Sequence, residues 1–269
     1  MQHPGLEHPF TRYVALGDSF TEGVGDEEPG LPNGVRGWAD RVAEELARTR
    51  HDFQYANLAI RGRLLQQIID EQLEPAVALE PDLVTISAGG NDLIRPGGDP
   101  DVLAAKLDAV VGRLRATGAE VVLFNGPDIA MTPVLRSIRG RVGIYNSNLH
   151  GVAAKHGAIV ADMWSARHLQ QPQMWAPDRL HFSAYGHHAI AILVLDALGV
   201  RHDLTPMEPE PLPVRTWQRM RLDDLHWARE HLAPWVLRRL RGQSSGDAIS
   251  PKRPTAAPVL PSPHEPRAD

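Results

Sequence analysis

The stretch Tyr13-Val-Ala-Leu-Gly-Asp-Ser-Phe20 decides the fold of this chain. A short apolar run ends there in glycine, aspartate and serine, which are common turn-forming residues. Apolar runs of similar length recur at residues 55–59, 83–87, 121–124 and 158–161. Short runs rich in valine, isoleucine and leucine are typical of buried strands in a parallel sheet. These runs therefore predict a five-stranded parallel sheet.

Longer amphipathic stretches separate the runs and predict helices at residues 38–50, 64–79, 101–117, 142–156 and 187–198. Gly118 and Gly157 follow two of these stretches, as glycine commonly does at the end of a helix. Strands that alternate with helices predict an α/β fold, a three-layer α/β/α sandwich. Ligands of such sheets bind beyond the carboxyl ends of the strands, so the polar residues that follow each strand are the candidates for function.

The composition is that of a globular protein, and it excludes several kinds of site. The chain has 269 residues, of which 42% are hydrophobic and 23% charged, and this length allows one domain. The net charge is -5, with basic and acidic residues interspersed, so we expect no nucleic-acid partner. Cysteine is absent, which excludes disulfides, thiolate metal ligands and a cysteine nucleophile.

Regional composition divides the chain into three parts. We expect a globular domain at residues 1–202, a helical appendage at 203–242 and a disordered tail, rich in proline, serine and alanine, at 243–269. Residues 214–241 are rich in tryptophan and arginine. Such a segment can bind a membrane surface or a partner, can cover the active site as a lid, or can dock its tryptophans on the globular domain, and we favour docking. The first residues lack the basic start and apolar run of a secretory signal, so we expect a cytoplasmic location.

Several polar groups follow the predicted strands. Ser19 lies at a strand-to-helix turn, where a helix N-terminus favours a developing oxyanion. Asp178 and His181 lie three residues apart on a later loop, a spacing that lets an aspartate orient a histidine base. Asn91 and Gly62 follow the third and second strands, where a side-chain amide and a backbone N–H can face the same crevice. Taken singly, each group is explained as well or better by a helix cap or a turn.

Together, these segments resemble the four sequence blocks of the GDSL/SGNH hydrolase family. The matching residues are Gly17-Asp18-Ser19, Gly62, Gly90-Asn91-Asp92 and Asp178 to His181, in this order along the predicted globular domain. The resemblance implies a flavodoxin-like fold and hydrolysis of esters through an acyl-enzyme. We expect small-molecule esters with short acyl or acetyl groups as substrates.

The resemblance also implies a role for each matching residue. Ser19 would be the nucleophile, His181 its general base, and Asp178 the residue that orients the base. The oxyanion hole would comprise the backbone N–H of Ser19, the backbone N–H of Gly62 and the side-chain amide of Asn91. No metal and no organic cofactor is required.

Other activities remain open at this point. The family also covers acyltransferases, thioesterases and carbohydrate deacetylases. A flavodoxin-like sheet can instead be a non-catalytic binding module that holds a phosphate at the Ser19 turn. His181, His187 and His188 lie close together in the sequence, but no zinc-ligand pattern surrounds them, so we expect no metal site.

Two arginines flank the predicted oxyanion glycine. Arg61 and Arg63 either favour an anionic substrate or pair with surface carboxylates such as Glu22 or Asp26. We favour the pairing, because surface arginines commonly lie beside carboxylates without a further role.

Overall fold

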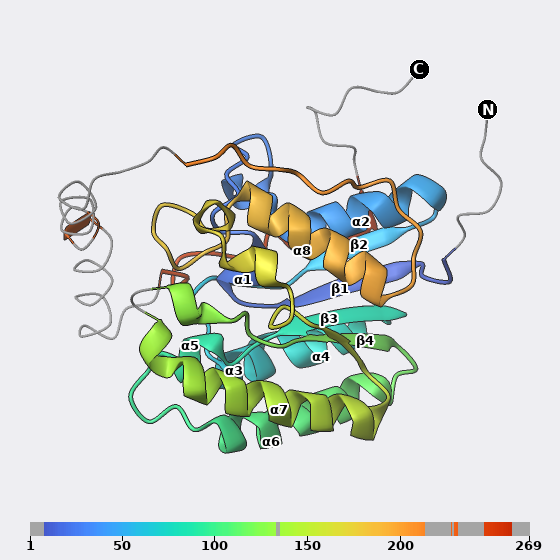
Figure 1. Ribbon diagram of the computed structural model, residues 1–269. Helices are drawn as coiled ribbons and strands as arrows, with labels where there is room; N and C mark the ends of the chain where they lie inside the picture. Colours follow the sequence, from blue (N-terminus) through green and yellow to red (C-terminus); the bar gives the residue numbers. More distant parts are fainter. Residues whose placement is uncertain (1–7, 133–134, 213–226, 228, 231–244, 260–269) are drawn as a thin grey trace.

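The computed structural model describes residues 8–132, 135–212, 227, 229–230 and 245–259. These residues form a sandwich in which one sheet lies between two layers of helices (Figure 1). The strand order of the sheet is β5-β4-β3-β1-β2-β6. The α/β sandwich predicted from the sequence is therefore confirmed, with six strands in place of the expected five.

Five parallel strands coincide with the apolar runs. They are β1 (Arg12–Gly17), β2 (Gln54–Asn57), β3 (Leu83–Ser87), β4 (Glu120–Phe124) and β5 (Ile159–Ala161). β1 pairs with β2 on one side and β3 on the other. Ser19, which follows β1 by two residues, therefore lies at the middle of the carboxyl edge of the sheet.

Helices cover both faces of the sheet (Figure 1). One face carries α2 (Gly37–Thr49) and α8 (Ala184–Ala197); the other carries α3 (Leu65–Ile68), α4 (Glu74–Ala78), α6 (Pro100–Arg115) and α7 (Arg139–His156). Two short helices, α1 (Ser19–Glu22) and α5 (Gly90–Leu93), follow β1 and β3. Single 3-10 turns span Pro32–Gly34, Ile129–Met131, Arg136–Ile138, Arg167–Gln170 and Pro172–Met174. A π-helical segment, Ile69–Leu73, joins α3 to α4 within the helix predicted at residues 64–79.

The two faces of β1 belong to two different hydrophobic clusters. Val14 and Leu16 pack with α6 and α7, whereas Tyr13 and Ala15 pack with α2 and α8. A strand that is buried on both faces needs apolar residues at every position, and this explains why the strands appear in the sequence as continuous apolar runs. None of the helices in the described part of the chain has the length and hydropathy required to cross a bilayer.

The C-terminal region differs from the expectation. Part of the tail predicted to be disordered forms β6 (Arg253–Pro258), which pairs antiparallel with β2. The prediction was wrong there because it considered only the lack of large apolar residues, whereas an edge strand is held by backbone hydrogen bonds on one side and tolerates proline.

The predicted appendage lies mostly outside the described residues. Residues 203–212 have no regular secondary structure, and of residues 214–241 the structure describes only 227, 229 and 230. Trp227 is buried, and the guanidinium carbon of Arg179 lies 5.1 Å from the centre of its ring. This one tryptophan therefore docks on the globular domain, as we favoured for the segment.

Candidate active site

The turn that carries Ser19 requires glycine at position 17. Gly17 has a φ of +151°, and a Cβ there would lie 2.5 Å from Thr21 Oγ1 and 2.7 Å from the carbonyl oxygen of Ser87. The side-chain amide of Gln72 donates to the carbonyl of Gly17 and accepts its N–H, both at 2.8 Å. Sequence analysis missed Gln72, because a glutamine within an amphipathic helix has no signature of its own. Only the structure points to Gln72, because it lies in the π-helical segment and such segments are frequent at functional sites.

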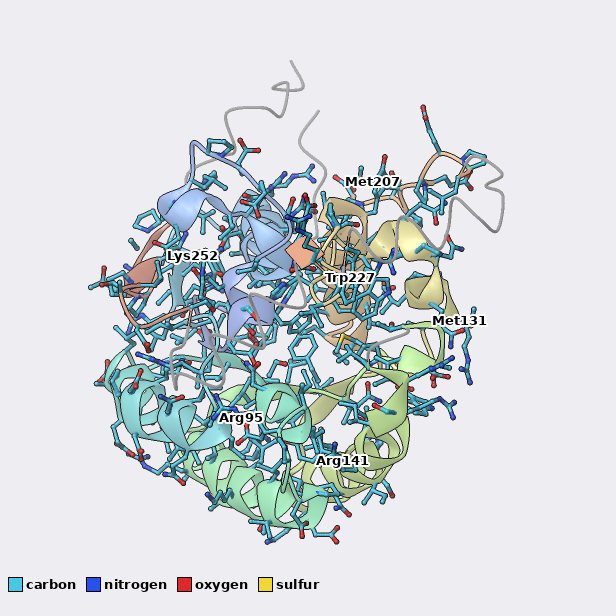
Figure 2. The ribbon with its side chains drawn as sticks, turned by 90° about the vertical axis from the view of Figure 1, so that its left-hand side faces the viewer. Arg95, Met131, Arg141, Met207, Trp227 and Lys252 are labelled. Atoms are coloured by element: carbon cyan, nitrogen blue, oxygen red, sulfur yellow. The ribbon has the colours of Figure 1, made fainter. Side chains whose placement is uncertain are left out.

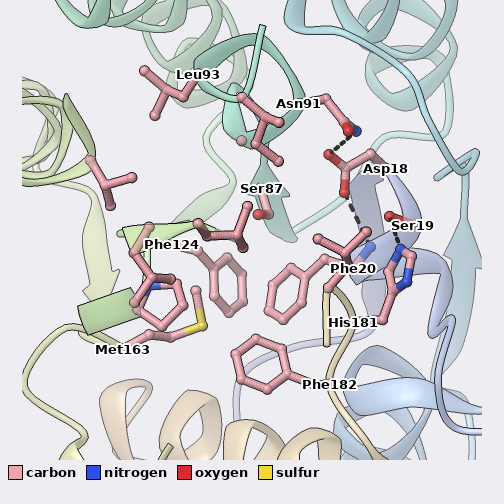
Figure 3. A pocket seen from close by; sticks show the side chains of 18 of the residues that line it. Asp18, Ser19, Phe20, Ser87, Asn91, Leu93, Phe124, Met163, His181 and Phe182 are labelled. Carbon is pink, nitrogen blue, oxygen red and sulfur yellow. Dashed lines mark hydrogen bonds between the residues drawn. The ribbon is translucent and has the colours of Figure 1, made fainter. Parts of the chain in front are cut away.

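Ser19, His181 and Asp178 form a chain of hydrogen bonds. His181 Nε2 lies 3.0 Å from Ser19 Oγ (Figure 3), and His181 Nδ1 lies 2.5 Å from Asp178 Oδ2. The second carboxylate oxygen of Asp178 accepts the backbone N–H groups of Leu180 and His181, both at 3.0 Å. The structure therefore brings together the three residues that the resemblance singled out, across 162 positions of the sequence.

The position of the proton on His181 follows from Asp178. Burial acts to raise the pKa of Asp178, but its hydrogen bonds with His181 and with backbone N–H groups outweigh burial and lower the pKa to about 2. A carboxylate that is ionised at neutral pH can only accept hydrogen bonds, so Nδ1 of His181 carries the proton. Nε2 of the neutral imidazole is left to accept the hydroxyl proton of Ser19, as a general base must.

Asp18 connects the serine turn to Asn91. Asn91 Nδ2 donates to Asp18 Oδ2 at 2.9 Å (Figure 3) and to the carbonyl oxygen of Arg63 at 3.1 Å. Asp18 Oδ1 accepts the N–H of Phe20 at 3.1 Å, so one carboxylate caps α1 and also orients the amide. Burial raises the pKa of Asp18 to about 6. Asn91 lines the same cavity as Ser19.

Gly62 lies on the loop between β2 and α3. Its φ of +78° is in the left-handed region that favours glycine. The next residue, Arg63, is held through its carbonyl by Asn91. Among the described residues, the backbone N–H groups of Gly62 and Ser19 have no protein acceptor. Both groups are thus available to an oxygen of a substrate.

The arginines that flank Gly62 pair with carboxylates, as we favoured, but the partner of Arg61 is buried and not on the surface as we expected. Glu22 is fully buried and accepts the backbone N–H of Arg61 at 2.8 Å, its Nε at 3.0 Å and its Nη2 at 2.6 Å. Arg63 Nε donates to Glu71 at 2.8 Å. Asp26, the other carboxylate considered, instead binds an arginine of α2. Arg61 is therefore a structural support of the loop.

An apolar cavity of about 200 Å³ opens beside the serine (Figure 3). Its apolar lining consists of Phe20, Ala88, Leu93, Ile94, Phe124, Pro127, Ile129, Leu135, Ile138, Val142, Tyr145, Met163, Trp175, Leu180 and Phe182. These residues come from the end of β4, from the segments that follow the strands, including α1 and α5, and from α7, and they share no motif. The sequence therefore could not predict the cavity, although it located the polar groups at its mouth.

His187 has a structural role, because both of its ring nitrogens bind backbone groups. Its Nδ1 accepts the N–H of Trp38 and its Nε2 donates to the carbonyl of Val24, both at 3.2 Å. Burial lowers the pKa of His187 to about 4. His188 Nε2 lies 2.7 Å from the carbonyl oxygen of Thr205. Within the described residues, no group of three His, Asp or Glu side chains could hold a metal ion.

With this geometry in view, comparison with known proteins decides the family. The model of the GDSL-like Lipase/Acylhydrolase family matches residues 15–189, more than half of the chain. The chain belongs to this family. Membership places this GDSL hydrolase among enzymes that hydrolyse esters.

Individual relatives of this GDSL hydrolase are more distant. YpmR of Bacillus subtilis (strain 168) is 32% identical over 88 residues, which are 30% of this chain and 32% of that protein. The fold is similar to that of LAE5, an alpha/beta hydrolase enzyme from the metagenome of Lake Arreo, with a TM-score of 0.60 and 24% identity over 71% of this chain and 95% of that chain. It is also similar to a catalytic mutant of Axe2, an acetylxylan esterase from Geobacillus stearothermophilus, with a TM-score of 0.61 and 21% identity over 71% and 95% of the two chains. At such identities the likeness shows the fold alone.

Proposed function

We propose that this GDSL hydrolase cleaves carboxylic esters through an acyl-enzyme on Ser19. The observation that carries the proposal is the hydrogen-bond chain from Ser19 through His181 to Asp178 at the mouth of an apolar cavity. Solved structures of the acetylxylan esterase Axe2 include catalytic mutants of a serine, an aspartate and a histidine, and these are the residue types of the chain seen here.

The proposed reaction has two steps of the same kind. Ser19 Oγ attacks the ester carbonyl while Nε2 of His181 takes the hydroxyl proton, and Asp178 stabilises the imidazolium that forms. The backbone N–H groups of Ser19 and Gly62 donate to the oxyanion. The Asn91 amide donates both of its N–H groups to Asp18 and to the carbonyl oxygen of Arg63, so it joins the oxyanion hole only when one of these bonds is exchanged for the substrate oxygen. His181 then returns the proton to the departing alcohol. In the second step a water molecule attacks the acyl-enzyme while His181 takes its proton. His181 then gives the proton to Ser19 Oγ, and the carboxylic acid leaves.

The cavity indicates the size of the acyl group. An apolar cavity of roughly 150 Å³ holds the six carbons of benzene. By the same proportion, the cavity of about 200 Å³ beside Ser19 has room for roughly eight carbons. The volume and the apolar lining support short acyl chains, as we expected, and favour chains longer than acetyl.

Hydrolysis of p-nitrophenyl esters of graded chain length tests the proposal. We expect Ser19→Ala to lower kcat by at least about 10³-fold, because the nucleophile is lost. Ser147→Ala, at an exposed position on α7, is the matched control and should keep full activity. Combining Ser19→Ala with His181→Ala should cost little beyond either change alone, because residues that act as a unit are not additive. Equal turnover by Ser19→Ala and the parent would refute the proposal.

A further inference from the structure

Residues 245–258, which we call the C-terminal strap, are fixed to the edge of the sheet by a buried cation. The side chain of Lys252, just before β6, has no exposed surface. Its Nζ donates to the carbonyl of Arg36 at 2.6 Å and to Asp40 Oδ2 at 2.9 Å. Lys252, labelled in Figure 2, therefore lies at the start of α2, which begins one residue after Arg36. A lysine is rarely buried unless it is paired, so this contact is a specific anchor of the strap.

A chain of hydrogen bonds leads from this anchor to the helix that begins at Ser19. Asp40 Oδ1 accepts the hydroxyl proton of Tyr55 at 2.9 Å. Asn57 Nδ2 donates to the Tyr55 hydroxyl and to the carbonyl oxygen of Thr21, each at 2.9 Å. Thr21 belongs to α1, so Lys252 is connected to the nucleophile helix through buried polar groups only.

A second contact of the strap touches the predicted oxyanion loop. The backbone of Gly246 packs on residues 60 and 61, so closely that a Cβ there would lie 2.1 Å from the carbonyl oxygen of Arg61 and 2.8 Å from Ile60 Cγ2. Asp247 Oδ1 lies 3.6 Å from Arg63 Nη1. The strap therefore contacts the residues on both sides of Gly62.

A third contact joins the strap to the buried carboxylate that supports this loop. Asn33 Nδ2 donates to the carbonyl oxygen of Ser250 and to Glu22 Oε1, both at 3.0 Å. Glu22 Oε2 in turn accepts the backbone N–H of Arg61. The loop is thus held from inside by Glu22 and from outside by Gly246.

We propose that the C-terminal strap is a positioning element of the active site. Gly246 fixes the loop that bears Gly62, and Lys252 fixes the position of α1, which carries Ser19, relative to this loop. The inference rests on the proposed function, since it assigns the Gly62 N–H to the oxyanion. A displaced oxyanion donor weakens binding of the tetrahedral intermediate but not of the ester in its ground state. The strap therefore acts on kcat and leaves KM unchanged.

Two variants of the full chain test the proposal, each with a matched control. Gly246→Ala adds the obstructing Cβ and is compared with Gly151→Ala, where a Cβ meets nothing within 4 Å. Lys252→Met removes the buried cation and is compared with Lys155→Met, whose side chain is 62% exposed. We expect both strap variants to lower kcat by about ten- to a hundredfold, with KM within about twofold. Affinity for a boronic acid, which mimics the tetrahedral intermediate, should fall by the same factor, and both controls should match the parent.

Hydrogen exchange provides a readout that does not need turnover. In Gly246→Ala, amides of residues 60–63 should exchange faster than in the parent and in Gly151→Ala, when followed by mass spectrometry. Unchanged exchange in this loop, or a kcat within twofold of the parent in both folded strap variants, would overturn the proposal. A parent without turnover on any ester would refute the proposed function instead, and exchange in the loop would still decide whether the strap holds it.

Discussion

Narrowing the cavity at Val142 should shorten the preferred acyl chain. Val142 is a buried residue of α7 that lines the cavity. Each methylene group that enters an apolar site contributes about 0.8 kcal/mol, which is about fourfold in kcat/KM. The parent enzyme should therefore gain activity stepwise from acetyl to octanoyl esters, by up to about 3,000-fold over the six added methylenes, and then lose the gain once the cavity is full.

Val142→Phe should shift the acyl chain length at which kcat/KM is highest. Phenylalanine has about four more carbons than valine, so the optimum should move from roughly eight carbons to roughly four. Acetyl ester hydrolysis should fall least, because the acetyl group does not reach the added ring. Val142→Ala enlarges the same part of the cavity and should move the optimum toward longer chains.

The assay is kcat/KM for p-nitrophenyl esters from acetyl to dodecanoyl. Ile144→Phe is the matched control, because Ile144 lies on the same helix but is 50% exposed and does not line the cavity. Thermal unfolding of each variant is measured in parallel, since overpacking of an interior costs about 1–3 kcal/mol. An unchanged optimum in folded Val142→Phe, or the same shift in Ile144→Phe, would refute the assignment of this cavity to the acyl group.

Three further predictions concern Asp178, His187 and Glu22. Asp178→Asn should lower kcat by about 10³- to 10⁴-fold in steady-state kinetics, because an amide can hold His181 in the wrong tautomer; a loss below tenfold would contradict this role. Because burial lowers the pKa of His187 to about 4, below its unfolded value near 6.5, its neutral form contributes stability that is complete above about pH 6.5 and is lost as the pH falls toward 4. Urea unfolding at pH 7 and 4.5 should therefore show a smaller loss of stability for His187→Gln than for the parent, and an equal loss would exclude this origin. Glu22→Ala should lower the free energy of unfolding by about 3–5 kcal/mol in urea titrations, because it leaves the partly buried guanidinium of Arg61 without its carboxylate; a loss below about 1 kcal/mol would contradict the pairing.

The sheet and the position of the polar groups could be predicted because both depend on local sequence. A central parallel strand is buried on both faces, so its run of apolar residues is visible without knowledge of its neighbours. Two of the candidate residues follow these runs closely, as Ser19 follows β1 and Asn91 follows β3, so knowing which strands end at one edge of the sheet is enough to group them. Asp178 and His181 lie far beyond the end of β5, and only the family resemblance grouped them with Ser19.

The remaining features depend on contacts between distant segments. The apolar part of the cavity is lined by side chains that have only their apolar character in common, and its volume depends on how α7 packs against the segments that follow the strands. The strap was predicted to be disordered because its composition offers little apolar area to bury. It is held instead by the buried ion pair between Lys252 and Asp40. Neither the ion pair nor the close approach of Gly246 to Arg61 has a local pattern in the sequence.

Asp18 bears on the alternatives left open for the Gly-Asp-Ser turn. As a helix cap alone, it would need only the oxygen that accepts from Phe20, yet its second oxygen binds Asn91, 73 residues later. A phosphate-binding module requires an electropositive helix N-terminus. Here the helix has only four residues and begins beside Asp18, whose pKa of about 6 leaves it mostly ionised at neutral pH. A carboxylate in that place repels a phosphate dianion, and a phosphate site would leave the bond from Asn91 to Asp18 without a purpose. A phosphate-binding module would also give no reason for the hydrogen-bond chain from Ser19 through His181 to Asp178, so the site favours an esterase over a binding module.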